Sequence, residues 1–303
     1  MASNQSRALT EMYVHWLSRM AAAPDMDLDT MRDLFDGWGR VTGEPDAVRY
    51  ADADAGGIPA LWAIPDGAPD DRVLLYSHGG GYVGGSSHSH RKLAGHLAQA
   101  AGVRALVHDY RRAPENPHPG PVQDARAVYD WLRAEGFAPE HIATVGDSAG
   151  GALSIALPLQ LRDSGAPLPG AIVALSPFLD LQATGATVET NAAHDALASK
   201  GMIEQMAAIF LGADGSPTDP LAAPLHADPS GLPPIYISTG GAEVLLDDSR
   251  RFAAKVEAAG GDVTLEVVPE MQHVFHFLAG RAPEADASVR GIGTWLRKQL
   301  DVS

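Results

Sequence analysis

The chain of 303 residues contains no cysteine. This absence excludes disulfide bonds, thiolate metal sites and every mechanism that uses a cysteine nucleophile. The histidines predict no metal site either. His88, His90 and His226 could suggest one, but no further ligand lies near them at helical or hairpin spacing. We therefore expect no metal and interpret these three side chains as solvated loop histidines.

Basic residues are scarce, with 22 Lys and Arg against 38 Asp and Glu and a formal net charge of −16. Because nucleic-acid affinity depends on clustered positive charge, DNA, RNA and anionic membranes are poor partner candidates. No run of about 18 apolar residues occurs, and the first 20 residues lack an uncharged apolar stretch of signal-peptide length. We expect a cytoplasmic protein without a membrane span.

The chain also lacks internal repeats, low-complexity tracts and linkers, which favours one domain. From residue 58 onward, short β-rich runs alternate with longer helical patterns. The expected strands cover 60–65, 72–77, 103–110, 142–148, 171–177, 234–240 and 263–269, and the expected helices cover 90–101, 121–136, 149–163, 246–260 and 284–300. The later strands are nearly continuous apolar runs, typical of a parallel sheet covered on both faces. The pattern predicts an α/β fold with a doubly wound sheet.

Two segments break this alternation. Residues 1–45 place large apolar side chains at helical spacing, and residues 183–225 contain one clear helix around 202–211. Ligands of parallel sheets bind beyond the carboxyl ends of the strands, where such segments lie. We therefore predict a catalytic domain of residues 46–303, covered by a helical cap made of residues 1–45 and the insertion at 183–225. The alternative is that both segments only pack on the sheet.

The strongest local signal is the sequence GDSAG at 146–150, which matches G-x-S-x-G between an expected strand and an expected helix. A sharp strand-to-helix turn exposes such a serine, and small residues two positions before and after it avoid collisions with neighbouring backbone. The turn also places the serine at a helix N-terminus, which favours developing negative charge. We predict that Ser148 is a nucleophile.

The sequence HGGG at 78–81 follows an apolar run and leaves backbone without side chains at a strand end. When a serine attacks an acyl carbon, an oxyanion forms that must be met by preorganised N–H donors. Glycine suits this task because no Cβ blocks the approach of the substrate oxygen. We assign the N–H groups of Gly79 and Gly80, with that of Ala149, to an oxyanion hole.

Together, HGGGY (78–82), DYRRAPE (109–115), GDSAGG (146–151) and HVF (273–275) resemble the hormone-sensitive-lipase family of α/β-hydrolase serine esterases. The resemblance extends over most of the chain. It implies an eight-stranded, mostly parallel sheet with an N-terminal cap, no cofactor, and hydrolysis of short- to medium-chain carboxylic esters. Arg112 departs from the usual leucine of that family, in a segment we expect to be structural.

The catalytic acid should come after Ser148 in the chain and beyond the end of a later strand. Glu243, Asp247 and Asp248 follow the strand expected at 234–240. Glu243 stands closest to the strand end and matches the first acid of the D-P-L-x-D pattern of the resembled family, as glutamate instead of aspartate. The other two would lie in the first turn of the next helix, where the helix dipole favours acidic residues, so their presence there has a structural explanation. We choose Glu243, with Asp247 as the alternative.

The general base should follow the last strand, where the chain reads PEMQHVFHF. His273 precedes Val274 and Phe275 in the H-x-F form of the resembled family, so we assign it as the base, with His276 as the alternative if the loop were shifted.

Four further residues beside these motifs receive substrate-binding or supporting roles. We expect His78 to anchor the glycine loop and Asp147 to hydrogen-bond loop backbone behind the nucleophile. Gly81 belongs to the same glycine run. Tyr82 would line the pocket mouth, although an aromatic at a strand end also suits a core position.

The resulting hypothesis is a serine carboxylesterase that acts on a small ester through Ser148, His273 and Glu243. A lactone hydrolase would use the same triad and differ in pocket shape. A third hypothesis is a non-catalytic small-molecule receptor on the same fold. It is disfavoured because all three triad positions are occupied by suitable residues. Relatives in the resembled family also favour a homodimer through the strand around 263–268 and the helix at 284–300.

Overall fold

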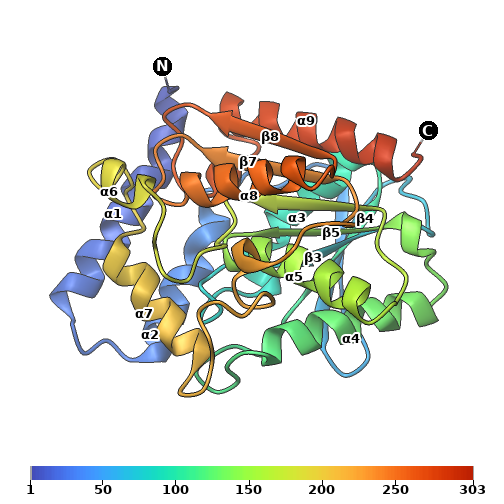
Figure 1. Cartoon of the computed structure of the whole chain (residues 1–303). Helices are drawn as coiled ribbons and strands as arrows, with labels where there is room; N and C mark the ends of the chain where they lie inside the picture. Colours follow the sequence, from blue (N-terminus) through green and yellow to red (C-terminus); the bar gives the residue numbers. More distant parts are fainter. Residues whose placement is uncertain (1, 303) are drawn as a thin grey trace.

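Residues 2–302 are described in a computed structural model, in which helices flank a central sheet (Figure 1). Over these residues the sheet has eight strands in the order β1-β2-β4-β3-β5-β6-β7-β8. The strands are β1 (Val48–Asp54), β2 (Pro59–Pro65), β3 (Val73–Ser77), β4 (Arg104–His108), β5 (Ile142–Asp147), β6 (Ala171–Leu175), β7 (Ile235–Gly240) and β8 (Val263–Val268). From β4 to β8 all neighbours are parallel, so their carboxyl ends meet at one edge.

The expected strands are confirmed to within two residues, but β1 was missed. Its sequence, VRYADAD, is polar at many positions, because the strand lies at the sheet edge and none of its residues is fully buried. β1 pairs antiparallel with β2, which is in turn antiparallel to β4. At the other edge lies β8, and the homodimer expected through it stays a prediction.

Helices cover both faces of the sheet, as the sequence predicted (Figure 1). The helices α3 (Ser87–Ala101) and α9 (Pro283–Gln299) cover one face, and α4 (Gly120–Ala134), α5 (Ala149–Asp163) and α8 (Leu246–Ala258) cover the other. Short 3-10 turns are η1 (Asn4–Ser6), η2 (Asp36–Arg40), η3 (Pro139–His141), η4 (Pro224–His226) and η5 (Phe275–Leu278). Both layers bury apolar side chains of the strands, which places two cores back to back across the sheet.

One histidine expected in a solvated loop is instead part of the core. His90 lies inside α3 and is fully buried. His88 and His226 are exposed as expected, but His88 also lies in α3 and His226 in η4, not in loops. Among residues 2–302, no group of three or more His, Asp or Glu side chains is arranged to hold a metal ion.

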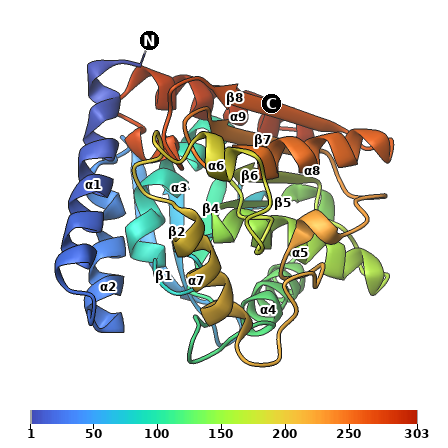
Figure 2. The ribbon, with the colours of Figure 1, turned by 60° about the vertical axis from the view of Figure 1, so that its left-hand side comes forward.

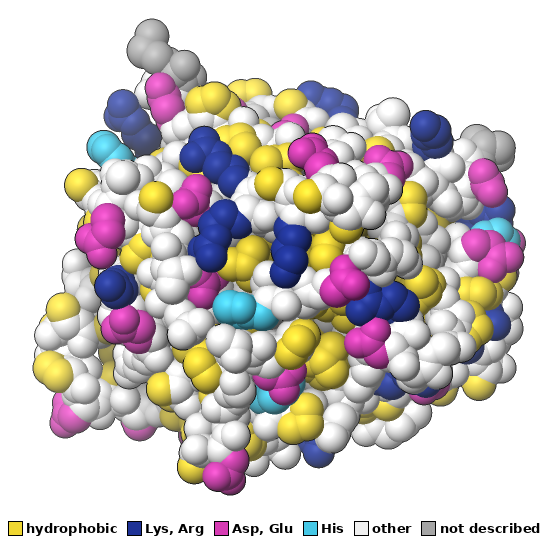
Figure 3. All heavy atoms as spheres, in the orientation of Figure 1, with side chains coloured by type: hydrophobic (Ala, Val, Ile, Leu, Met, Phe, Trp, Pro, Cys, Tyr) yellow, Lys and Arg dark blue, Asp and Glu magenta, His cyan; other side chains and the backbone are white. Residues whose placement is uncertain are grey.

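The same residues include no helix with the length and apolar character needed to cross a bilayer. On the face in Figure 3, basic side chains are interspersed with acidic ones.

The two segments that interrupt the alternation lie side by side beyond the carboxyl ends of the strands (Figures 1 and 2). The N-terminal segment forms α1 (Arg7–Ala22) and α2 (Leu28–Phe35), and the second segment forms α6 (Thr187–Thr190) and α7 (Lys200–Leu211). Figure 2 shows α1 and α2 at one side of the sheet and α7 in front of the strands. Both segments thus border the edge where a parallel sheet binds ligands.

An aromatic cluster attaches the N-terminal segment to the rest of the fold. Trp16 of α1 packs against Phe35 and Trp38, with ring centroids 5.7 and 5.2 Å apart. Trp38 in turn stacks on Phe277 of η5, at 5.5 Å and an interplanar angle of 10°. Since large aromatic side chains bury the most apolar surface, this cluster contributes much of the stability of the segment.

We predict that Trp16→Ala lowers the free energy of unfolding by about 3–5 kcal/mol, because it leaves a cavity inside this cluster. Val14→Ala is the matched control on the same helix, since Val14 is 52% exposed whereas Trp16 is 4% exposed. The control should change stability by less than about 0.5 kcal/mol. Denaturant titration measures both values, and equal effects of the two substitutions would contradict the packing argument.

Candidate active site

Ser148 sits on the sharp turn between β5 and α5, with φ of 52° and ψ of −118°. This is a strained conformation for a residue with a Cβ, and it persists because the surroundings determine it. A Cβ on Gly146 would lie 2.1 Å from the carbonyl oxygen of Gly150, and one on Gly150 would lie 1.9 Å from that of Ser77. The turn therefore closes only with glycine on both sides of Ser148, pressed against the end of β3.

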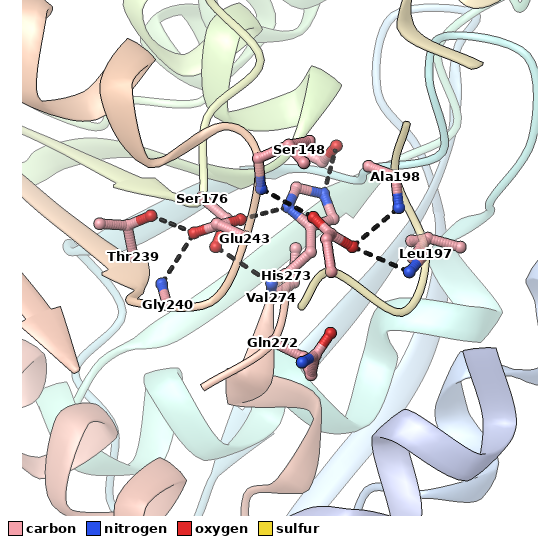
Figure 4. Close-up of polar contacts among 12 residues, drawn as sticks. Ser148, Ser176, Leu197, Ala198, Thr239, Gly240, Glu243, Gln272, His273 and Val274 are labelled. Atoms are coloured by element: carbon pink, nitrogen blue, oxygen red, sulfur yellow. Dashed lines mark hydrogen bonds and ion pairs between the residues drawn. The ribbon is translucent and has the colours of Figure 1, made fainter. Parts of the chain in front are cut away.

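His273 lies between Ser148 and Glu243, as Figure 4 shows. Its Nε2 is 3.0 Å from Oγ of Ser148, and its Nδ1 is 2.5 Å from Oε2 of Glu243. The other carboxylate oxygen of Glu243 accepts hydrogen bonds from the hydroxyl of Thr239 and from the N–H of Gly240, the latter at 2.7 Å. These bonds fix the acid at the end of β7, where it can orient the imidazole.

The alternative residues for this arrangement lie elsewhere. Asp247 accepts a hydrogen bond from the N–H of Ala186 at 2.7 Å, away from the histidine. Asp248 is buried and accepts bonds from two backbone N–H groups of the loop after β6, and burial raises its pKa to about 8. His276 bonds to Ser238 at 2.8 Å inside the fold. The structure thus brings Glu243 and His273, the chosen pair, to Ser148.

Opposing effects act on the pKa of His273. Burial lowers it, but the hydrogen bond and the charge of Glu243 raise it, and the charges of Asp195 and Asp147 add to that effect, so the pKa lies above its usual 6.5. The backbone of the same residue is held from α1, because the hydroxyl of Tyr13 donates to the carbonyl oxygen of His273 at 2.9 Å. The environment therefore favours the imidazolium form and fixes its position.

The glycine loop requires a correction to one predicted donor. Gly79 does not line the cavity beside Ser148, and its N–H donates to Oδ1 of Asp147 at 3.1 Å and lies 3.2 Å from Nε2 of His90. Gly80 and Gly81 instead line the cavity beside Ser148, and among the described residues their N–H groups have no acceptor. The sequence predicted that the side chain of Asp147 would hydrogen-bond loop backbone. It does so by accepting from the N–H of Gly79, and this N–H is therefore not available to a substrate in the cavity.

Two other residues of this loop, His78 and Tyr82, are buried and pack against aromatic rings. The Nδ1 of His78 lies 2.8 Å from the carbonyl oxygen of Gly79, and its ring stacks on Tyr110 at 4.2 Å. Burial and the nearby His90 lower the pKa of His78 to about 4, so this ring is neutral at pH 7. Tyr82 is fully buried against Phe210, with ring centroids 3.6 Å apart, and the expectation that it lines the pocket mouth is wrong.

A small apolar cavity of about 60 Å³ opens onto Ser148 and His273. Besides these two residues and the glycines, it is lined by Phe35, Trp38, Phe178, Leu197, Ala198, Met202, Ile203, Met206 and Leu245. Phe35 and Trp38 come from the N-terminal segment, and the residues from Leu197 to Met206 come from the second segment. Both segments therefore shape the space above Ser148.

Sequence reasoning missed the contact of Tyr13 with His273. The residue stood in the apolar pattern of α1, which indicated only that it would be buried. Its hydroxyl also accepts a hydrogen bond from Nε1 of Trp38 at 3.2 Å, so a cavity wall and the histidine backbone share one buried hydroxyl. A tyrosine among apolar helix positions was the available signal, since a buried hydroxyl needs a partner.

A serine at a strand-to-helix turn, with a histidine and an acid following in that chain order on an α/β sheet, defines the α/β hydrolases. Residues 74–277 match a family described by the alpha/beta hydrolase fold. An acetyl-hydrolase of Streptomyces hygroscopicus is 43% identical over 242 residues, which is 80% of this chain and 80% of that protein.

Solved structures agree with this match. The crystal structure of an esterase from the bacterial hormone-sensitive lipase family has a TM-score of 0.94 and 43% identity, and covers 99% of both chains. EstE5, whose crystal was soaked with p-nitrophenyl butyrate, has a TM-score of 0.89 and 36% identity over 99% of this chain and all of that one. The chain belongs to the α/β-hydrolase family, and within it to the esterases of the hormone-sensitive lipase type.

We predict that Gly150→Ala reduces esterase activity at least about 100-fold, because the new Cβ would collide with the carbonyl oxygens of Ser77 and His78 and displace the turn that holds Ser148. The control is Gly201→Ala in α7, where a Cβ meets nothing within 4 Å. This control should keep its activity and its melting temperature. Hydrolysis assays beside thermal melts test the pair, and a Gly150→Ala enzyme of normal activity would contradict the steric argument.

Proposed function

We propose that this esterase is a serine carboxylesterase with a triad of Ser148, His273 and Glu243 that acts on short- to medium-chain carboxylic esters. The observation that carries the proposal is the continuous contact from Oγ of Ser148 to Nε2 of His273 at 3.0 Å and from Nδ1 to Glu243 at 2.5 Å, at the base of an apolar cavity. A hydroxyl within hydrogen-bond reach of an oriented imidazole is the geometry of an activated nucleophile.

In the proposed reaction, His273 accepts the proton of Ser148 while Oγ bonds to the ester carbonyl carbon. The tetrahedral intermediate then collapses, and the imidazolium returns the proton to the departing alcohol oxygen. Water repeats the sequence on the acyl-enzyme and releases the carboxylic acid. Glu243 holds the tautomer that keeps Nε2 free to accept a proton, and its charge stabilises the imidazolium.

For the oxyanion we propose the N–H groups of Gly80, Gly81 and Ala149. Gly80 and Gly81 line the cavity beside Ser148, and Ala149 begins α5, whose dipole favours negative charge at its N-terminus. A single donor of this kind is commonly worth about 2.7–4 kcal/mol of transition-state stabilisation.

The apolar walls support a neutral ester as substrate, and we propose that residues 1–45 and 183–225 act as the cap that selects it. The cavity of about 60 Å³ has room for roughly four to six waters, since each needs about 10–15 Å³ on this measure. A short acyl chain fits such a space without movement of the cap. The acetyl-hydrolase relative and the EstE5 crystal soaked with a butyrate ester are consistent with this preference.

We predict that activity on p-nitrophenyl esters is higher for acetate and butyrate than for octanoate. Ser148→Ala and His273→Ala should each lower kcat by roughly 10⁴- to 10⁶-fold, since they remove the nucleophile and the base. His88→Ala is the control, because His88 is exposed and lies outside the site. Steady-state assays on purified, folded protein measure all four enzymes.

Other outcomes of the same series favour other functions. Strong preference for a panel of lactones over the linear esters would favour the lactone hydrolase. A wild type inert on every ester and lactone that still binds a small molecule would favour a receptor. Full hydrolysis by Ser148→Ala would contradict the proposed nucleophile.

The raised pKa of His273 leads to a further prediction. Only the neutral imidazole accepts the serine proton, so kcat/KM should fall as the pH drops through that pKa. Because Glu243 and the neighbouring carboxylates raise the pKa, the half-maximal point on the acid side should lie above pH 6.5. A pH profile of p-nitrophenyl acetate hydrolysis measures it, with stability checked at each pH. A half-maximal point below pH 6 would contradict the electrostatic argument.

A further inference from the structure

Residues 191–198, which we call the strap, connect α6 to α7 and cross the two loops of the proposed triad. At one end, Nδ2 of Asn191 donates to the backbone carbonyl oxygen of Glu243 at 2.9 Å. Further along, the side-chain amide of Gln272, the neighbour of His273, bonds to strap backbone through both its oxygen and its nitrogen, at 2.7 and 2.9 Å. The strap therefore holds the acid loop and the histidine loop in one arrangement.

Asp195 stands in the middle of the strap and uses both carboxylate oxygens. One accepts a hydrogen bond from the N–H of Val244, the residue after Glu243, at 2.8 Å. The other accepts from the N–H groups of Leu197 and Ala198, both at 2.8 Å. Figure 4 shows Leu197 and Ala198 on one side of His273, and both line the cavity. A single side chain thus ties the cavity wall to the loop of the catalytic acid.

The carboxylate of Asp195 interacts with the positive charge of His273. Its three hydrogen bonds all come from backbone N–H donors, and within residues 2–302 no Lys or Arg pairs with it. A carboxyl group that only accepts hydrogen bonds is suited to the ionised form. Burial raises the pKa of Asp195, and the strongest opposing effect is the positive charge of His273. Among the described residues, the imidazolium is therefore the cation whose charge acts most strongly on this carboxylate.

Several other titratable groups lie near the imidazole of His273, and they differ in whether they carry a charge that can act on it. The titratable groups that face His273 are Glu243 from the acid loop, Asp195 from the strap, Asp147 from β5, Tyr13 from α1 and His276 from η5. Tyr13 and His276 are uncharged near pH 7, because burial raises the pKa of the first well above 10 and lowers that of the second to about 3. Asp147 is engaged with His90, Tyr76 and the glycine loop.

We propose that Asp195 is a positioning residue of the esterase reaction: its carboxylate fixes the loop of Glu243 against the cavity wall, and its charge supports the imidazolium of His273. The proposal rests on the proposed triad. It assigns to the second segment a part in catalysis besides shaping the cavity. An opposite charge favours the protonated imidazole in the free enzyme and in the transition state alike.

The test is Asp195→Asn, which keeps the size of the side chain, removes its charge and replaces one of its two accepting oxygens by an NH2 group. Because His273 loses one of the carboxylates that favour its protonation, the acid limb of the kcat/KM profile should move down by about one pH unit. The same loss in the transition state should lower kcat about tenfold at pH 8. Should this variant fail to fold, as judged by circular dichroism and melting, Asp195→Ser is measured instead with the same expectation.

Two controls separate charge from structure. Asn191→Ala loosens the strap without changing charge, and Asp219→Asn removes a charge from a turn of the same segment that contacts no triad residue. Asp219→Asn should leave the acid limb in place, and Asn191→Ala should leave it in place or move it to higher pH, so neither control should move it to lower pH. A limb that stays in place or moves up in Asp195→Asn would overturn the proposal, since loosening alone admits water and raises the imidazole pKa. Activity retained by Ser148→Ala would instead refute the triad, independently of Asp195.

Discussion

The close approach of two backbones at Ser148 is the constraint on which the site depends. Gly146 and Gly150 let the turn between β5 and α5 press against the end of β3, and Ser148 is held in a conformation that a residue with a Cβ rarely adopts. Because β3 and β5 are neighbours in the sheet, the same contact sets the distance from the serine to the glycine loop. The sheet order therefore fixes the place of Ser148 and of the glycine loop together.

Asp147 extends this constraint from the turn to the glycine loop. It accepts hydrogen bonds from the hydroxyl of Tyr76 at 2.7 Å and from the N–H of Gly79 at 3.1 Å, and it lies 3.3 Å from Nε2 of His90. Burial raises its pKa, but the charge and hydrogen bond of His90 and the hydrogen bond of Tyr76 outweigh burial and hold the pKa below its ordinary value. The residue before the proposed nucleophile is thus a buried anion that holds the loop rigid, so that Gly80 and Gly81 present their backbone to the cavity.

Most of the fold was predictable because it depends on local signals. A parallel strand buried on both faces reads as a continuous apolar run, and the turn at Ser148 needs glycine at fixed positions, so both are visible in the sequence. The strand β1 was not predictable in this way, because its edge position leaves it partly exposed and polar. The donor role of Gly79 failed for a different reason: Asp147, 68 residues later, takes its N–H. Contacts such as those of Tyr13 or Asp195 arise only from the tertiary fold.

The charges around His273 also bear on the release of the product. An ester is neutral and suits the apolar cavity, whereas the carboxylic acid formed from it is ionised at pH 7 and is poorly solvated in that cavity. Glu243, Asp147 and Asp195 all lie close enough to the imidazole to favour its positive form. The same negative field disfavours a second anion in the cavity. In the proposed reaction, an arrangement that stabilises the imidazolium therefore also repels the carboxylate that is produced.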